Sequence, residues 1–171
     1  MASVAAQGWV HQINISRGGA PKLPVVSAEV GVEGLAGDYH LDTRNHGGPQ
    51  RAVCLFTLEM IERLAAEGNS IYPGAVGENV TLRGIPQELL IPGATLAIGS
   101  ETRLEITSYT APCDGIAHAF STGQFTRISQ KLHPGESRVY ARVTHGGEIH
   151  TGDEVTLWPA VAPVAEPVEE G

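Results

Sequence analysis

Residues 94–109, ATLAIGSETRLEITSY, decide the fold class of this chain. In the second half of the stretch, Leu104 and Ile106 alternate with polar residues, which is the period-two pattern of a half-buried β-strand. Gly99 and Ser100 suit the turn between this half and the apolar residues before it. The stretch therefore predicts two short strands, 94–98 and 103–109, joined by a tight connection.

Similar strand-like stretches recur along the whole chain. Its 171 residues include 21 Gly and 11 Pro, so regular structure is interrupted often. Gly146-Gly147 is predicted to make a hairpin turn between the strand before it and the strand after it. The nine predicted strands are 8–15, 24–32, 51–56, 79–83, 94–98, 103–109, 138–144, 148–150 and 154–158. Closure removes sheet edges in a small domain, so we expect a mostly β fold, a closed or nearly closed β-barrel with two or three short helices.

Three local patterns make more detailed predictions. In strand 8–15, the odd-numbered residues from Trp9 to Ile15 share one face, and Val10 lies on the other. Residues 57–68 predict a helix, because Thr57 suits an N-cap and apolar residues follow at helical spacing. The segment up to Leu132 is predicted to be helical in part, with Phe125, Ile128 and Leu132 on one side.

Length and charge limit the organisation and the partners of the chain. We expect one domain over 8–158 and a disordered tail over 159–171, which has no periodic pattern. The net charge of −8 argues against nucleic acid as a partner. No run of eighteen apolar residues and no leader pattern are visible, so we expect no membrane partner and a cytoplasmic location. The stretch 123–145 is nevertheless basic and suits a small anion; it holds Arg127, Lys131, Arg138 and Arg142 against Glu136 alone.

Cys113 is the strongest single candidate for chemistry. Pro112 fixes the approach of the chain and Asp114-Gly115 turns it away, so the thiol is expected to project from a strand end. A thiolate there can attack an electrophile, carry a persulfide or ligate a soft metal. The competing interpretation is that Cys113 is an inert small apolar residue, and from the residues alone it is slightly favoured.

A long glycine-rich segment, 31–50, has no apolar periodicity and is interpreted as functional. At its end, HGGPQR combines the His46 imidazole, the backbone of Gly47 and Gly48, and the Arg51 guanidinium, a set that suits phosphate or another oxyanion. His40 is interpreted as an ordinary polar loop residue, and no pattern typical of a structural zinc site is present.

The segment PGAVGEN, 73–79, places Gly77, Glu78 and Asn79 in a second glycine-rich loop. These polar side chains either cap the backbone of a tight turn or line a pocket and bind a ring system such as a pterin. The residues alone leave both interpretations open. The glycine spacing does not match a dinucleotide fingerprint or a P-loop.

Taken together, these segments resemble the MOSC domain, named for the C-terminal domain of molybdenum cofactor sulfurase. The resemblance extends over roughly residues 9–157 and is nearest to small, stand-alone bacterial members. It is carried, in order, by INISRGGAPKLPV, GVEGLAGDYH, HGGPQRAV, PGAVGEN, APC and ARVTHGGEIHTGDEV.

The resemblance implies a barrel like that of the pyruvate kinase barrel domain, and binding of the molybdenum cofactor, a phosphorylated pterin dithiolene. Cys113 would be the molybdenum ligand and catalytic residue, while Lys22, His46 and Arg51 would hold the pterin phosphate. Pyridoxal phosphate is not expected. The cofactor-binding set that the resemblance implies is Lys22, Asp38, His46, Gly47, Gly48, Arg51, Gly77, Glu78, Asn79 and Arg142.

Three functions remain open from the sequence. The first is reduction of N-hydroxylated compounds, with electrons from a flavin or iron-sulfur reductase. The second is a persulfide carrier or cofactor-handling protein that is loaded by a cysteine desulfurase and has no turnover of its own. The third is a binding barrel in which Cys113 is incidental.

Overall fold

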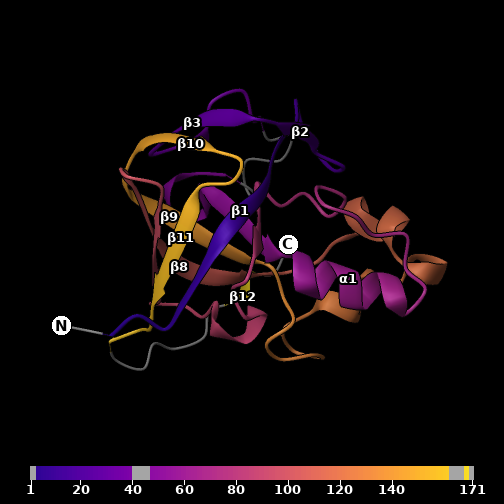
Figure 1. Ribbon diagram of the computed structural model, residues 1–171. Coiled ribbons are helices and arrows are strands. Elements are labelled where there is room, and N and C mark those ends of the chain that lie inside the picture. Colours follow the sequence, from indigo (N-terminus) through magenta and orange to yellow (C-terminus); the bar gives the residue numbers. More distant parts are fainter. Residues whose placement is uncertain (1–2, 40–46, 162–167, 170–171) are drawn as a thin grey trace.

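The computed structural model describes residues 3–39, 47–161 and 168–169. Seven strands form a closed barrel in the order β11-β7-β8-β9-β5-β6-β1, and β1 pairs with β11 to complete the ring. Figure 1 shows the barrel beside a helical lobe that contains α1. The barrel strands are β1 (Ala6–Ile15), β5 (Val53–Thr57), β6 (Val80–Arg83), β7 (Thr95–Ile98), β8 (Thr102–Thr110), β9 (Val139–His145) and β11 (Glu154–Trp158). The predicted mostly β barrel is confirmed.

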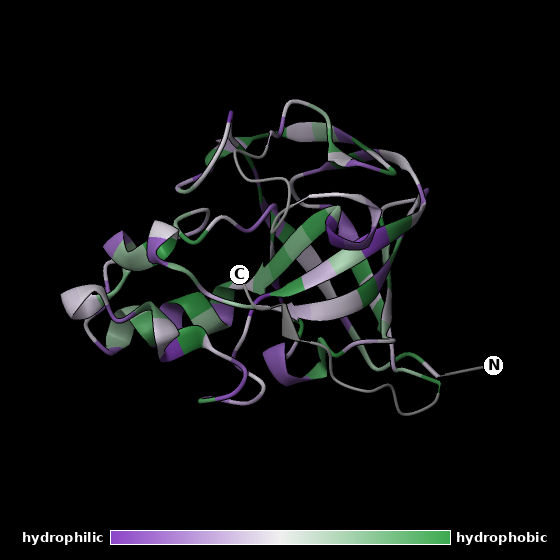
Figure 2. Cartoon of the chain, turned by 180° about the vertical axis from the view of Figure 1, so that it is seen from behind, coloured by the Kyte–Doolittle hydropathy of each residue, from purple (hydrophilic) through white to green (hydrophobic). Residues whose placement is uncertain are grey.

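The barrel interior is filled by the apolar faces of these strands. In β8, Leu104 and Ile106 are 1% exposed, as the alternating pattern of residues 103–109 predicts. Antiparallel pairing of β7 with β8 confirms the predicted hairpin around Gly99. Figure 2 shows the resulting apolar segments along the strands. Further buried members of this core are Leu55, Val80, Leu82, Val139 and Leu157.

The face predicted for the first strand is wrong, because β1 contains a bulge. Val10 pairs with Leu82 but Gln12 pairs with Thr81, so His11 is an extra residue in the ladder. The bulge turns both Val10 (1% exposed) and Ile13 (0% exposed) into the core. Trp9 is left 43% exposed on the outside, where the guanidinium of Arg83 lies 4.9 Å from its ring centroid.

A separate three-stranded sheet, β10-β3-β4, lies at one end of the barrel (Figure 1). It comprises β3 (Ser27–Gly31), β4 (Gly34–Leu35) and β10 (Gly147–His150). The predicted hairpin at Gly146-Gly147 is therefore wrong, since β10 pairs with β3 and not with β9. The chain at Gly146 crosses over β3 so closely that a Cβ there would lie 2.4 Å from the carbonyl oxygen of Val30.

The predicted strand 24–32 is divided in two. The short strand β2 (Leu23–Val25) pairs with β1 on the barrel, whereas β3 belongs to the small sheet. Val26 lies between them and is 80% exposed, because the chain leaves one sheet there and joins the other.

The helical lobe consists of α1 (Leu58–Ala66) and short 3-10 segments packed around a second apolar core. Thr57 caps α1 as predicted, because its hydroxyl accepts a hydrogen bond from the Met60 backbone N–H at 3.2 Å. The helix also makes the crossover that lets β5 and β6 pair in parallel. The 3-10 segments are η1 (Pro49–Arg51), η2 (Gln87–Leu89), η3 (Asp114–Ala119), η4 (Ser121–Gly123) and η5 (Phe125–Ile128).

The helical face predicted between Phe125 and Leu132 is only partly correct. Ile128 is fully buried and Phe125 packs against the second core, but Leu132 is 62% exposed. The segment η5 ends at Ile128, and Ser129 has an extended backbone, so the helical spacing does not continue to Leu132.

The predicted tail begins at Pro159, and residues 162–167 and 170–171 lie outside the described part. Of the predicted tail, the described residues Val168–Glu169 form β12, which pairs in parallel with β8. No helix of the described residues is long and apolar enough to cross a membrane.

Candidate functional site

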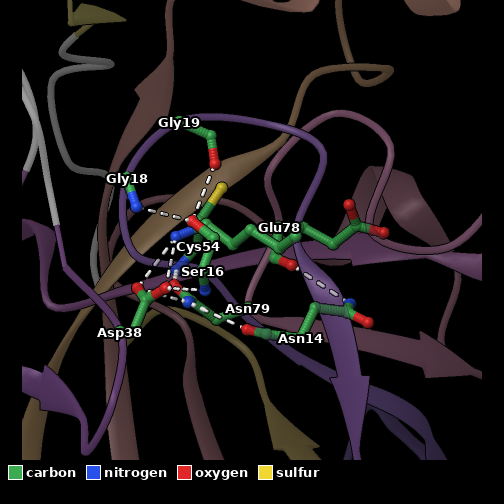
Figure 3. Close-up of polar contacts among 9 residues, drawn as sticks. Asn14, Ser16, Gly18, Gly19, Asp38, Cys54, Glu78 and Asn79 are labelled. Atoms are coloured by element: carbon green, nitrogen blue, oxygen red, sulfur yellow. Dashed lines mark hydrogen bonds and ion pairs between the residues drawn. The ribbon is translucent and has the colours of Figure 1, made fainter.

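A buried polar cluster joins the end of β1 to two of the glycine-rich loops, and Asp38 is at its centre (Figure 3). We call it the Asp38 cluster and define it as Ser16, Lys22, Asp38, Cys54 and Asn79. Lys22 Nζ lies 2.7 and 2.8 Å from the two carboxylate oxygens of Asp38, and these side chains are only 7% and 2% exposed. The Asp38 carboxylate also accepts hydrogen bonds from the Ser16 backbone N–H at 2.9 Å and from Asn79 Nδ2 at 2.9 Å.

Asn79 fastens this cluster to the barrel wall. Its backbone N–H donates to the Cys54 carbonyl at 2.8 Å, and its side-chain Oδ1 accepts from the Cys54 N–H at 2.9 Å. Its carbonyl accepts from the backbone N–H of Asn14 at 2.7 Å. The segment 72–79, which we call the 72–79 loop, is thus held against β1 and β5 by the last residue of GEN.

Glu78 caps its own loop. Its Oε2 accepts hydrogen bonds from the Gly74 N–H at 3.1 Å and from Thr81 Oγ1 at 2.8 Å, and in Figure 3 the carboxylate points away from Asp38. Its Oε1 is buried and has no hydrogen-bond partner within the described ranges. Burial raises the pKa of Glu78, because removal from water disfavours the charged form. Of the two interpretations of the loop, backbone capping is the one whose contacts the structure contains.

Two glycines let the 72–79 loop lie close to Lys22. A Cβ at Gly74 would stand 2.5 Å from the Lys22 carbonyl oxygen, so a larger residue does not fit there. Gly74 and Gly77 both have positive φ, at 90° and 81°, a backbone conformation that is unfavourable for residues with a side chain. Lys22, Asp38, Gly77, Glu78 and Asn79, five residues of the predicted cofactor set, are therefore brought together.

Cys113 stands three residues after β8, at the N-cap of η3, and is half-buried. Its sulfur lies over Gly115, since a Cβ on that glycine would be 3.5 Å from Sγ. The ring Nε2 of His118, in the same 3-10 segment, is 3.0 Å from the Ala75 carbonyl oxygen. This contact connects the segment after Cys113 to the 72–79 loop. The thiol of Cys113 is only half-buried, so it is not enclosed by apolar side chains.

The other cysteine has a different environment. Cys54 is 6% exposed, its Sγ is 3.9 Å from Thr110 Oγ1, and burial raises the pKa of its thiol. The positive charge of Arg138 partly opposes this rise, as does the charge of Lys22.

Other residues of the predicted set lie apart from the cluster or outside the described residues. Arg142 is on β9, where its Nε forms an ion pair with Glu105 Oε1 at 2.6 Å. Arg51 ends η1 just before β5 and is half-buried, and Gly47 and Gly48 precede that segment with φ of 82°. His46, like His40, lies outside the described residues. The part of the chain that the structure describes contains no group of three or more His, Cys, Asp or Glu able to hold a metal ion.

Sequence reasoning missed three contributors, Asn14, Ser16 and Cys54, and named Arg138 only as one member of the basic stretch 123–145. Asn14 donates through Nδ2 to the Glu78 carbonyl and to Thr81 Oγ1, both at 3.1 Å. An asparagine in an apolar strand is a signal that can be read, because a buried amide requires partners. Ser16 contributes a backbone N–H, which leaves no side-chain signal.

Comparison with known proteins identifies the family. The family model described as MOSC domain matches residues 42–156. Among solved structures, the YUAD protein of Bacillus subtilis superposes with a TM-score of 0.74 at 17% identity, covering 92% of this chain and 98% of that chain. YiiM of Escherichia coli superposes with a TM-score of 0.70 at 19% identity, covering 93% and 73%. These likenesses support the fold.

One curated relative matches more closely in sequence. The chain is 29% identical to the YflK protein of Bacillus subtilis (strain 168) over 128 residues, which are 73% of this chain and 56% of that protein. The chain thus spans about half the length of this relative.

Proposed function

Because the chain belongs to the MOSC domain family, which is associated with the molybdenum cofactor, we propose that it is a molybdenum-cofactor oxidoreductase that reduces N-hydroxylated compounds. The observation that carries this proposal is the half-buried thiol of Cys113, which follows a barrel strand and begins a segment tied to the 72–79 loop. A thiol in that position is open to a ligand, whereas the thiol of Cys54 is not.

The residues fit such a cofactor in two respects. A thiolate is a soft ligand that suits molybdenum, so Cys113 would hold the metal. A phosphorylated pterin also requires cationic and backbone donors; Lys22, His46, Arg51 and the Gly47-Gly48 backbone would supply them, with Arg142 as a further cation. When bound, the cofactor would supply a centre that exchanges two electrons.

The side chains of the Asp38 cluster would act by positioning. Asp38, Glu78 and Asn79 are almost fully buried, and their side chains are already engaged in hydrogen bonds or ion pairs within the protein. Through their hydrogen bonds these residues hold Lys22 and the 72–79 loop in place. We propose that they keep the edge of the site rigid, which lowers the entropy lost on binding.

The overall reaction requires an external reductant. Two electrons and two protons convert a hydroxylamine into an amine and water by cleaving the N–O bond. The electrons would come from a flavin or iron-sulfur reductase, acting as the partner of this chain. Two free cysteines suit a reducing compartment, so we place the reaction in the cytoplasm.

A persulfide carrier is the second candidate. A thiol that is half-buried but not sealed is able to accept sulfur from a cysteine desulfurase as well as to ligate a metal. In this case the chain would have no turnover of its own. Incubation with a desulfurase would then add the mass of one sulfur atom to Cys113.

Reduction of a hydroxylamine-type base analogue by the cofactor-loaded protein, with a reduced viologen dye as electron donor, tests the proposed activity. We expect dye oxidation by the wild type and by Cys54→Ala, and none by Cys113→Ala. Equal activity of the Cys113→Ala variant would remove the proposed role. An inactive wild type that becomes persulfidated at Cys113 would favour the carrier.

A further inference from the structure

Several charged side chains of the described residues have little exposed surface, among them Lys22, Asp38, Glu78 and Arg138. Lys22 has a counter-ion, because both of its short contacts are with the Asp38 carboxylate. Arg138 is 5% exposed and has no carboxylate within 4.0 Å in the described part of the chain. Its Nη1 donates to the Val76 carbonyl oxygen at 2.7 Å, and its buried Nε has no acceptor among the residues that the structure describes.

An arginine in this state is unusual. Guanidinium remains protonated at all ordinary pH values, so burial cannot be relieved by loss of its proton. Buried charges are normally paired, because removal from water is costly. An unpaired, buried guanidinium with an unused N–H donor is therefore suited to bind a negative group.

Two ionisable groups on which its charge acts do not supply a negative partner. The charge of Arg138 acts on the thiol of Cys54 and on the carboxyl of Glu78. Burial nevertheless raises the pKa of both groups, which favours their neutral forms.

Arg138 also lies at the candidate site. Its carbonyl accepts a hydrogen bond at 2.9 Å from the N–H of Thr110, the last residue of β8, and Cys113 follows three residues later. Its Nη1 holds the carbonyl of Val76, so the side chain also reaches the 72–79 loop. That loop thus contacts both the paired cation Lys22, whose backbone N–H donates to the Gly74 carbonyl, and the unpaired cation Arg138.

We propose that Arg138 is the principal donor of a binding site for a tetrahedral oxyanion, either free phosphate or sulfate or the phosphate of a monoester. Guanidinium binds such groups through two parallel N–H donors, and this geometry matches their oxygen atoms. The site differs from the cofactor-binding set that the resemblance implies, whose members Lys22 and Arg142 already form ion pairs. It does not require the cofactor, so it stands independently of the proposed activity.

Titration of the cofactor-free full chain with inorganic phosphate, followed by calorimetry and by ³¹P NMR at constant ionic strength, tests the site. We expect saturable binding to the wild type and a loss in affinity of at least about tenfold in Arg138→Gln, since hydrogen bonds to charged groups are strong. Arg63→Gln is the matched control, because it removes an exposed arginine of α1 that is paired with Glu136, and it should bind as the wild type does.

Two further measurements keep the result decisive. If Arg138→Gln does not fold, Arg138→Lys keeps the charge but loses the forked donors, and it should bind phosphate more weakly than the wild type. Comparison with glycerol 3-phosphate identifies the source, since tighter binding of the monoester indicates a phosphorylated molecule and tighter binding of phosphate a free anion.

Absence of saturable binding of both anions to the wild type would overturn the proposal, and so would equal binding by the wild type and both Arg138 variants. A Cys54 that is already a thiolate at neutral pH, detected by its ultraviolet absorbance, would also overturn it by providing an internal counter-ion. None of these outcomes depends on molybdenum, so failure here is distinguishable from failure of the proposed activity.

Discussion

Replacement of Asp38 by alanine tests the Asp38 cluster directly. The carboxylate is 2% exposed and is the counter-ion of Lys22, which is 7% exposed. Its removal leaves the nearly buried ammonium of Lys22 without its counter-ion. The Ser16 N–H and Asn79 Nδ2 also lose the carboxylate acceptor to which they donate. Breaking a buried ion pair in this way costs about 3–5 kcal/mol. For a chain of this size, the melting temperature should fall by roughly 6–20 °C.

The assay is urea unfolding of the Asp38→Ala variant beside a matched surface pair. Glu105→Ala breaks the exposed ion pair with Arg142, where the two side chains are 34% and 42% exposed, and it should cost less than about 1 kcal/mol. Adding Lys22→Met to Asp38→Ala removes the lone charge, so the double variant should be more stable than Asp38→Ala. If Asp38→Ala unfolds within about 1 kcal/mol of the wild type, the buried pair does not stabilise the fold as we infer.

Three other predictions follow from single residues. The pKa of Glu78 is raised in the fold, so the folded state holds the carboxyl proton more tightly than the unfolded state does. The contribution of this group to stability is complete below about pH 4.3, the ordinary pKa of glutamate. It is lost as the pH rises through the folded pKa. Glu78→Gln should therefore gain in unfolding free energy relative to the wild type with rising pH, and a constant difference would contradict the raised pKa. Cys113 should react with a thiol reagent at least about tenfold faster than Cys54, which is buried and has a raised pKa; equal rates, followed by mass spectrometry, would show that Cys113 is sealed. Thr57→Ala should lower the unfolding free energy by about 1 kcal/mol through loss of the cap on the Met60 N–H, and an unchanged urea midpoint would show that the cap contributes nothing.

Local patterns predicted the barrel because local patterns determine most of its strands. Alternation in 103–109 reports which side chains enter the core, and the predicted strand 154–158 coincides with β11. The helix signal at Thr57 has an equally local cause, since the N-cap hydroxyl contacts the third residue after it. Such features depend on neighbours in the sequence and can be read from it.

The errors arise where distant segments decide the conformation. The bulge at His11 is defined by the pairing of β1 with β6, about seventy residues later in the chain. The hairpin expected at Gly146-Gly147 fails because β3 offers a partner for β10 that no local rule reveals. A glycine pair indicates that the backbone turns, but it does not specify the strand that the chain then meets.

The same division applies to the candidate site. Resemblance to the family directed attention to Lys22, Asp38 and Asn79, which the structure brings together, although their roles as cofactor ligands stay predictions. The missing counter-ion of Arg138 depends on which carboxylates surround it in three dimensions. No pattern along the chain distinguishes this arginine from Arg142, four residues later, which has a partner.

Molybdenum and pterin content tests the central claim, that Cys113 is the metal ligand of a cofactor-binding MOSC barrel. The wild type, Cys113→Ala and Cys54→Ala would be purified from a host that makes the cofactor, and metal and pterin would be measured per chain. We predict that the wild type and Cys54→Ala carry both, and that Cys113→Ala carries no molybdenum. Wild-type molybdenum content in Cys113→Ala would contradict the claim.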